Sequence, residues 1–318
     1  MNNRELHVIF GTGPLGLSVM RALQRRDRAI RMINRSGERG AAIPPEVEVV
    51  AGDAYRPDFT RRVTAGASVV YQCAQPPYSA WVEKFPSLQA AILEGAAASG
   101  AKFIVGENTY MYGDTGGRAL TEDLPHDAET RKGKVRAEMT EALFAAHRSG
   151  KVRAASARGS DFYGPFVLGS AVGERVFEPA LQGKRAQFLG KLDHPHTFTF
   201  IDDFGEAMAL LGEREAALGE AWHVPNDRPR ITQREFGELI FEEVGLPPQI
   251  GSMGPLMMRI GGLFVPEARE MVEMMYEFEK PFVVDSSKFE RTFGVRGTPL
   301  REALGRTVDW YRTRPQTD

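Results

Sequence analysis

Short apolar runs alternate with amphipathic stretches through the first half of the chain. The short runs are rich in β-branched and other apolar residues, which is typical of strands, and several of the stretches between them show helical spacing. Strands that alternate with helices predict βαβ units and a parallel sheet. The expected strands are Leu6–Phe10, Ile30–Asn34, Val47–Ala51, Ser68–Cys73, Lys102–Val105 and Val152–Ala157, and the expected helices are Leu15–Arg25, Ser87–Ser99 and Lys134–His147.

This alternation stops after about Phe162, where glycine, proline and methionine-rich helical segments predominate. The change predicts a smaller lobe that follows a nucleotide-binding domain. We therefore expect an α/β protein with a doubly wound parallel sheet in residues 1–165, with further strands from about residues 195–225, and a mainly substrate-binding lobe in residues 166–318.

Composition narrows the class of protein. The 318 residues carry 40 Lys and Arg against 42 Asp and Glu, a formal net charge of −2, which gives no electrostatic drive toward nucleic acid or an anionic membrane. A single cysteine, Cys73, excludes an internal disulfide, and its place at a strand end predicts a buried structural thiol rather than a nucleophile. The chain shows no signal peptide and no apolar stretch of about 18 residues, so we expect a cytoplasmic protein.

A glycine-rich segment follows the first expected strand and opens the first helix. It has the pattern G-x-G-x-x-G of dinucleotide-binding loops, in the strand–loop–helix context that the pattern requires. Gly11 allows a tight turn, Gly13 lets the backbone approach a pyrophosphate, and Gly16 lets helix and strand pack closely. Pro14 suits the first helical position. The residues predicted to bind a dinucleotide here are Gly11, Gly13, Pro14, Leu15 and Gly16.

The end of the second strand carries the signal for the choice of cofactor. An NAD site usually places an acidic residue there for the ribose 2′-hydroxyl, but this chain has Asn34, Arg35 and Ser36. A guanidinium binds a 2′-phosphate in a bidentate manner. The sequence therefore favours NADP(H) over NAD(H), with Arg35 as a solvated loop charge as the alternative.

Several later segments match one further pattern in the same order. They are Gly52-Asp53, Cys73-Ala74-Gln75-Pro76, Tyr112-Gly113-Asp114, Arg158 to Pro165, Phe198 to Asp203, and Asp285 to Lys288 with Gly294, Pro299 and Trp310. Together they resemble the extended short-chain dehydrogenase/reductase superfamily, in particular its NAD-dependent epimerase/dehydratase branch. The resemblance covers nearly the whole chain. It implies a Rossmann-type fold, cofactor contacts from Asp53, Ala54, Cys73, Ala74 and Gln75, and a homodimer formed through the helices Ser87–Ser99 and Lys134–His147.

The catalytic pair of that family is incomplete in this chain. The family uses Tyr-x-x-x-Lys with a nearby Ser or Thr, and the Lys and the cofactor lower the pKa of the tyrosine. Lys134 matches the Lys and is expected to contact the cofactor ribose, although it could also be one solvated charge in a basic helix start. Thr130 stands at the Tyr position, and an aliphatic hydroxyl is a poor acid. Asn108 stands at the Ser/Thr position and can still donate a hydrogen bond to a carbonyl oxygen.

Three interpretations follow from this mismatch. Another acid, among Tyr110, Tyr112 and Tyr163, serves an oxidoreductase; Tyr163 is also a structural residue of the family. Alternatively, hydride moves to an activated substrate such as an iminium or an enone without strong acid catalysis. In the third interpretation, the protein binds NADP(H) as a sensor or scaffold and turns nothing over.

The expected substrate side also departs from the family. Asp161 stands where Asn is frequent and would repel a diphosphate, and His196 lies near a position where Arg is usual. Both changes argue against a sugar nucleotide, although a sugar-nucleotide epimerase or dehydratase stays an alternative. Loop spacing with proline between His194 and His196 argues against a metal site.

The methionine-rich segment Pro266–Glu279 has apolar residues at helical spacing, which indicates either a core stripe or an adaptable apolar lid. The lid would favour a small apolar carbonyl- or imine-like substrate. The expected substrate contacts are Asp161, Tyr163, His196 and Met274.

Overall fold

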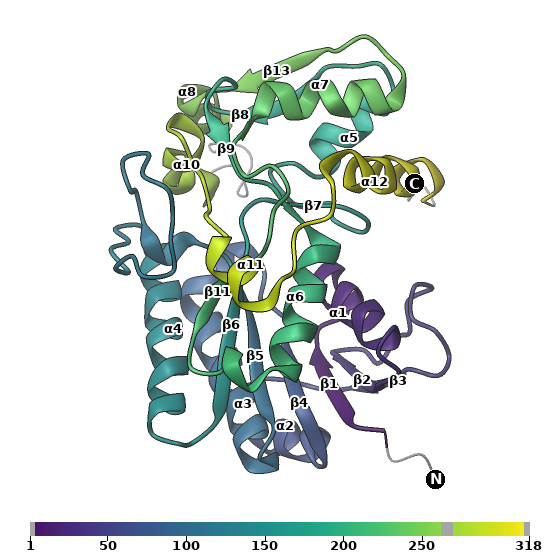
Figure 1. Cartoon of the computed structure of the whole chain (residues 1–318), viewed down its shortest axis with the longest axis vertical. Coiled ribbons are helices and arrows are strands. Elements are labelled where there is room, and N and C mark those ends of the chain that lie inside the picture. Colours follow the sequence, from purple (N-terminus) through teal and green to yellow (C-terminus); the bar gives the residue numbers. More distant parts are fainter. Residues whose placement is uncertain (1–3, 262–269, 315–318) are drawn as a thin grey trace. The chain divides into compact units, whose positions relative to one another are not determined.

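The apolar runs of the first half form a seven-stranded sheet in the computed structural model, which describes residues 4–261 and 270–314. Its strands are β1 (Leu6–Phe10), β2 (Ala29–Asn34), β3 (Glu48–Ala51), β4 (Ala67–Gln72), β5 (Lys102–Glu107), β6 (Arg153–Arg158) and β11 (Ala221–His223). They lie in the order β11-β6-β5-β4-β1-β2-β3, and the pairings from β3 to β6 are parallel (Figure 1). The expected α/β doubly wound sheet is confirmed. The winding reverses beside β1, and open α/β sheets bind ligands outside the carboxyl ends of the strands at such a point.

Alternation along β1 explains why helices cover both faces of this sheet. Val8 and Phe10 point to one face and are buried with Ile92 and Leu143, whereas Ile9 points to the other face, toward α1. The first face carries α2 (Pro57–Thr64), α3 (Trp81–Ser99) and α4 (Arg131–Arg148); the second carries α1 (Pro14–Gln24) and the later part of α6 (Ile201–Glu213) (Figure 1).

The expected strands and helices of this half are all present, and their ends differ. The helix expected from Ser87 begins at Trp81 and continues through Pro86. The helix expected from Lys134 begins at Arg131. Helix α2 was not expected, because its eight residues carry few apolar positions.

The remaining strands form three two-stranded sheets. β7 (Phe162–Tyr163) pairs with β10 (Thr199–Phe200), β9 (Pro195–His196) with β12 (Ile231–Thr232), and β8 (Ala186–Leu189) with β13 (Ile250–Met253). An aromatic core that includes Phe177, Phe188 and Phe236 lies among these strands and the helices α5 (Glu174–Leu181), α7 (Gln233–Val244) and α12 (Leu300–Thr313). A capping box between Thr232 and Glu235 starts α7.

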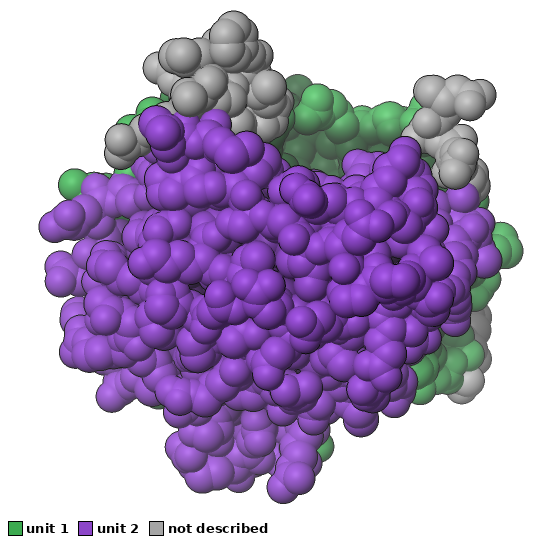
Figure 2. All heavy atoms as spheres, turned by 90° about the horizontal axis from the view of Figure 1, so that it is seen from above, with its two compact units in different colours: residues 1–111, 131–158, 204–222 green, residues 112–130, 159–203, 223–318 purple. Residues whose placement is uncertain are grey.

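The chain divides into two compact units that interleave along the sequence. Unit 1 contains residues 1–111, 131–158 and 204–222, and unit 2 contains residues 112–130, 159–203 and 223–318 (Figure 2). The domain boundary near residue 165 stays a prediction. No helix in the described part of the chain is long and apolar enough to cross a membrane.

The methionine-rich segment is only partly described, since residues 266–269 lie outside the described ranges. Its remainder contains a 3-10 turn (Val272–Met274) and α10 (Tyr276–Glu279) rather than one continuous helix. Met275 and Phe278 are buried against Leu189 and Met258, and Met274 is fully buried. This packing favours the core interpretation of the stripe. Two other short helices of unit 2 are α8 (Pro255–Gly261) and α11 (Ser287–Phe293).

Candidate functional site

Two of the three loop glycines are required by the packing of the chain itself. Gly11 has φ +111° and donates its N–H to the Ile33 carbonyl at 2.9 Å. A Cβ there would lie 2.8 Å from the Ala74 nitrogen, and a Cβ on Gly16 would lie 2.1 Å from the Gly11 oxygen. Only glycine therefore fits at these two positions, with or without a ligand.

The third loop glycine, Gly13, has no such reason within the protein. Its φ of −77° and ψ of −173° are accessible to any residue, and a Cβ built on it meets nothing within 4 Å. Gly13 is the N-cap of α1, with Pro14 in the first turn. The first N–H groups of a helix have no intrahelical acceptor, and they form the positive end of the helix dipole. The open space beside these donors fits a pyrophosphate.

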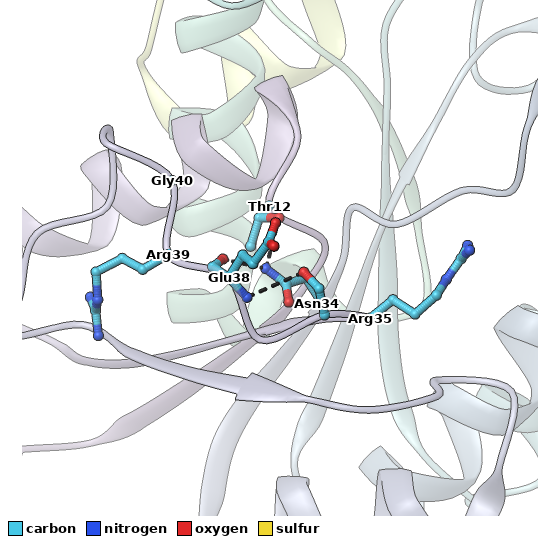
Figure 3. A pocket seen from close by; sticks show the side chains of 7 residues that line it. Thr12, Asn34, Arg35, Glu38, Arg39 and Gly40 are labelled. Carbon is cyan, nitrogen blue, oxygen red and sulfur yellow. Dashed lines mark hydrogen bonds between the residues drawn. The ribbon is translucent and has the colours of Figure 1, made fainter.

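A hollow of about 820 Å³ opens at the carboxyl end of β2. It is lined by Thr12, Asn34, Arg35, Ser36, Glu38, Arg39 and Gly40 (Figure 3). The Asn34 side chain shapes this loop: its Oδ1 accepts from the Gly37 N–H at 2.6 Å, and its Nδ2 donates to the Glu38 carbonyl at 2.9 Å. Its amide is therefore engaged in local structure and supplies no negative charge to the hollow.

Two guanidiniums and one carboxylate supply the charge of this hollow. Arg35 and Arg39 are exposed and extend to opposite sides of the loop (Figure 3). Within residues 4–261 and 270–314, Arg35 forms no ion pair. Glu38 is also exposed, so the three formal charges sum to +1 and the hollow favours an anion.

The residues that follow β3 and β4 lie beside the glycine loop. The Gly52 N–H donates to the Asn34 carbonyl at 3.0 Å, which places the following Asp53 and Ala54 next to the end of β2. The Cys73 N–H donates to the Phe10 carbonyl at 2.9 Å. Burial raises the pKa of the Cys73 thiol, which opposes a role as nucleophile. The segment with the predicted cofactor contacts Cys73, Ala74 and Gln75 therefore begins beside the glycine loop that follows Phe10.

The end of β5 carries Asn108 and Tyr110. The Asn108 Oδ1 accepts from the Tyr110 N–H at 3.3 Å. The Tyr110 hydroxyl lies 3.3 Å from the hydroxyl of Tyr78, a residue that the sequence analysis did not select. Two phenols from the ends of neighbouring strands are therefore within hydrogen-bond reach of each other.

Helix α4 carries one exposed and one buried lysine in its first turn, and the ribose contact of Lys134 stays a prediction. Lys134 is exposed, whereas Lys132 is 1% exposed and its Nζ lies 4.5 Å from the centroid of the Tyr78 ring. Thr130 belongs to unit 2 and Lys134 to unit 1. The signal that could have identified Lys132 is its spacing of four residues from Arg136, which is also buried.

Two further tyrosines that the sequence selected as acids are buried in unit 2. The Tyr112 hydroxyl lies 2.8 Å from His223 Nε2, and His223 Nδ1 lies 2.9 Å from the Asp285 carbonyl. A carbonyl only accepts, so Nδ1 carries the proton and Nε2 accepts from Tyr112. Burial raises the pKa of Tyr163 well above its usual value, and its ring packs on Phe200.

The predicted substrate residues Asp161 and His196 contact each other. Asp161 Oδ2 lies 2.5 Å from His196 Nε2, and the His196 ring stacks on Phe278 with centroids 5.1 Å apart. Nearby Glu277 is buried, and burial together with the charge of Asp161 raises the pKa of its carboxyl. No group of three or more His, Cys, Asp or Glu residues in the described ranges is arranged to hold a metal ion.

Comparisons with known proteins identify the family. The family model described as "NAD dependent epimerase/dehydratase family" matches residues 8–224. A search of curated proteins finds no match.

Similar solved structures share the fold over nearly their whole length. The dTDP-glucose 4,6-dehydratase of Bacillus anthracis in complex with NAD has a TM-score of 0.79 at 16% identity, covering 97% of this chain and 96% of that one. The UDP-N-acetylglucosamine 4-epimerase of Bacillus cereus has a TM-score of 0.78 at 13% identity, with 99% of each chain covered. The dTDP-glucose 4,6-dehydratase DesIV of Streptomyces venezuelae, with NAD bound, has a TM-score of 0.77 at 18% identity, covering 96% and 97%. The chain belongs to the NAD-dependent epimerase/dehydratase family.

Proposed function

We propose that the protein is an NADP(H)-dependent oxidoreductase that acts on a small, apolar carbonyl- or imine-like substrate. The observation that carries the proposal is the hollow at the end of β2, where Arg35 and Arg39 stand and the position usually held by a carboxylate is the neutral Asn34. When bound, the dinucleotide supplies or accepts a hydride.

The charge of the hollow supports NADP(H). A ribose 2′-phosphate brings about two negative charges, and a guanidinium such as that of Arg35 binds it more strongly than it binds a hydroxyl. The Glu38 carboxylate opposes the phosphate, but it is exposed to solvent, which screens its charge. The glycine loop supports the dinucleotide itself, because Gly13 leaves space beside the helix N-terminus that the protein does not fill.

The substrate proposal rests on unit 2. The Asp161 carboxylate would repel a substrate diphosphate near it, and the buried Glu277 supplies no cation that would attract one. The His196 ring lies against three aromatic rings, those of Phe198, Phe278 and Phe282, so the surroundings of the pair are apolar. These features favour an uncharged or weakly polar substrate over a sugar nucleotide.

The test is turnover with NADPH on a panel of small aldehydes, ketones, enones and imines, followed by loss of reduced-cofactor absorbance. UDP- and dTDP-sugars with NAD or NADP form the comparison panel. We expect oxidation of NADPH with at least one apolar substrate and no conversion of the sugar nucleotides. Conversion of a sugar nucleotide would contradict the substrate class, and tight NADPH binding without any turnover would show a catalytically silent cofactor-binding protein.

A further inference from the structure

Three polar side chains converge in unit 1 at the carboxyl ends of β4 and β5. Tyr78 lies in the 3-10 turn after β4 (Tyr78–Ala80), Tyr110 in the 3-10 turn after β5 (Tyr110–Tyr112), and Lys132 in the first turn of α4. The two hydroxyl oxygens are 3.3 Å apart, and the Lys132 Nζ lies 4.5 Å from the centroid of the Tyr78 ring. Both tyrosines are partly exposed, whereas Lys132 is buried.

The aromatic packing around Trp81 holds the two phenols. The Trp81 ring meets the Tyr78 ring edge-on at 5.0 Å and lies 6.0 Å from the Tyr110 ring. Its indole N–H donates to the Pro76 carbonyl at 3.2 Å, which fixes the ring. Groups whose rotamers are locked by packing keep their mutual geometry, as a proton-transfer site requires.

A buried network of ion pairs and hydrogen bonds around Glu107 lies next to this cluster in unit 1. The Arg136 guanidinium lies 4.9 Å from the Phe85 centroid and pairs with Glu107 at 3.4 Å. Glu107 also accepts from Arg158 at 3.1 Å and from the Thr140 hydroxyl at 2.8 Å. This network lies one helical turn from Lys132 on the same face of α4.

The strand order puts the two phenols on the nicotinamide side of the switch point. The proposed 2′-phosphate site lies at the end of β2, on one side of β1, while β4 and β5 lie on the other. A dinucleotide bound across the carboxyl ends of a doubly wound sheet extends from one side to the other. A dinucleotide held in this way would place its reactive half at the ends of β4 and β5, where Tyr78 and Tyr110 lie.

We propose that Tyr110 is the proton donor of this enzyme and that Tyr78 and Lys132 are its positioning residues, in place of the Tyr-x-x-x-Lys pair that Thr130 interrupts. The proposal rests on the oxidoreductase function proposed above. Tyr110 is assigned as the donor because it follows Asn108, which stands at the position where the family polarises the substrate carbonyl.

Reduction of a carbonyl substrate needs one hydride and one proton. A bound reduced dinucleotide would supply the hydride to the carbonyl carbon, and the π electron pair would move to the carbonyl oxygen. That oxygen takes the proton of the Tyr110 hydroxyl and becomes an alcohol. The charge left on the Tyr110 oxygen would be stabilised by a hydrogen bond donated by the Tyr78 hydroxyl and by the charge of the Lys132 ammonium, which lies over the Tyr78 ring, and water would return the proton. The 3.3 Å separation is long for such a bond and is expected to shorten as the charge develops.

The first test needs neither cofactor nor substrate. Phenolate formation in the purified protein is followed by ultraviolet difference absorbance as the pH is raised. We expect one phenolate to form ahead of the rest, to be lost in Tyr110→Phe, and to form later in Tyr78→Phe and Lys132→Met, whereas Lys132→Arg retains it. The background is favourable, because burial raises the pKa of four other tyrosines: Tyr55, Tyr71, Tyr163 and Tyr311. An early phenolate that survives Tyr110→Phe, or none in the wild type, overturns the proposal.

The second test is the pH profile of turnover. We expect Tyr110→Phe to lower kcat about 10²- to 10⁴-fold with NADPH affinity unchanged. Lys132→Met should shift the basic limb of the profile upward, and Lys132→Arg should restore it, which loss of packing alone would not produce. The control is Tyr276→Phe, which removes a partly buried phenol from unit 2.

The two tests separate the possible failures. A wild type that oxidises no NADPH on any substrate removes the proposed function, while the phenolate titration still reports on the cluster. A wild type that turns over, with Tyr110→Phe equally active or with Tyr112→Phe inactive in its place, overturns this inference alone. Thermal unfolding of each variant shows whether it folds. If Lys132→Met does not fold, the phenolate titration of the conservative Lys132→Arg variant replaces it, and loss of the early phenolate there overturns the role of Lys132.

Discussion

Replacement of Gly13 by alanine separates the demands of the ligand from those of the fold. A Cβ at this position meets no atom within 4 Å, and the backbone angles are accessible to alanine. The new methyl group would project into the space where the pyrophosphate is expected to lie against the start of α1. Gly16→Ala is the matched opposite, because its Cβ would lie 2.1 Å from the Gly11 carbonyl oxygen, a backbone atom.

The magnitudes follow from these two environments. For Gly13→Ala, the smaller entropy of the unfolded chain stabilises by about 0.4–1 kcal/mol. The weaker N-cap preference of alanine costs a similar amount, about 0.5–1 kcal/mol. The free energy of unfolding should therefore change by less than about 1 kcal/mol. The methyl group should raise the Kd for the dinucleotide about 30-fold or more, equivalent to about 2 kcal/mol.

The assay combines urea unfolding of the cofactor-free protein with calorimetric titration of NADPH. Gly16→Ala should lower the free energy of unfolding by about 1–3 kcal/mol before any ligand is added, since the backbone itself must move. Gly13→Ala should unfold like the wild type and bind poorly. A Gly13→Ala variant with wild-type affinity would refute the placement of the pyrophosphate beside α1.

Three further predictions concern the core, pH and assembly. Glu107→Gln leaves the buried Arg136 and Arg158 without a counter-charge, and urea unfolding should show a loss of about 3–5 kcal/mol; a loss below 1 kcal/mol would contradict the network. Burial lowers the pKa of His7 from 6.5 to about 4, so the folded protein favours the neutral imidazole. The contribution of His7 to the free energy of unfolding is therefore full above pH 6.5, and up to about 3 kcal/mol of it is lost as the pH falls to about 4. The pH series of His7→Gln should be flatter over that window, and an unchanged slope would exclude His7 as its source. Static light scattering should give a molar mass twice the chain mass of 35.2 kDa for the expected homodimer, and the mass of a single chain would contradict it.

The sheet could be predicted because its strands are apolar enough to stand out one by one. Residues 103–105 are continuously apolar and residues 6–10 are interrupted only by His7, as is typical of strands covered on both faces. The strands of unit 2 that span two residues, such as β9 and β12, are too short to leave a periodic signal. The start of α3 was misplaced because Pro86 suggests a helix boundary, yet the helix continues through it.

Only those parts of the candidate site that are formed by residues close together in the sequence could be predicted. The glycine loop and the Arg35 loop each lie within a few residues, so their chemistry can be inferred from spacing. The pairing of Tyr78 with Tyr110 and Lys132 depends on which strands are neighbours, and no local pattern records it. The motif match selects Lys134 and says nothing of Lys132. Two positions along a helix turn a side chain by about 200°, so Lys132 faces the interior while Lys134 is exposed.

The comparison of NADPH with NADH binding tests the central claim most directly. Calorimetric titration at fixed ionic strength should give a Kd for NADPH at least about tenfold below that for NADH. Arg35→Ala should remove most of that difference by weakening NADPH binding while leaving NADH binding nearly unchanged. Tighter binding of NADH by the wild-type protein would contradict the assignment of the β2 hollow to a 2′-phosphate.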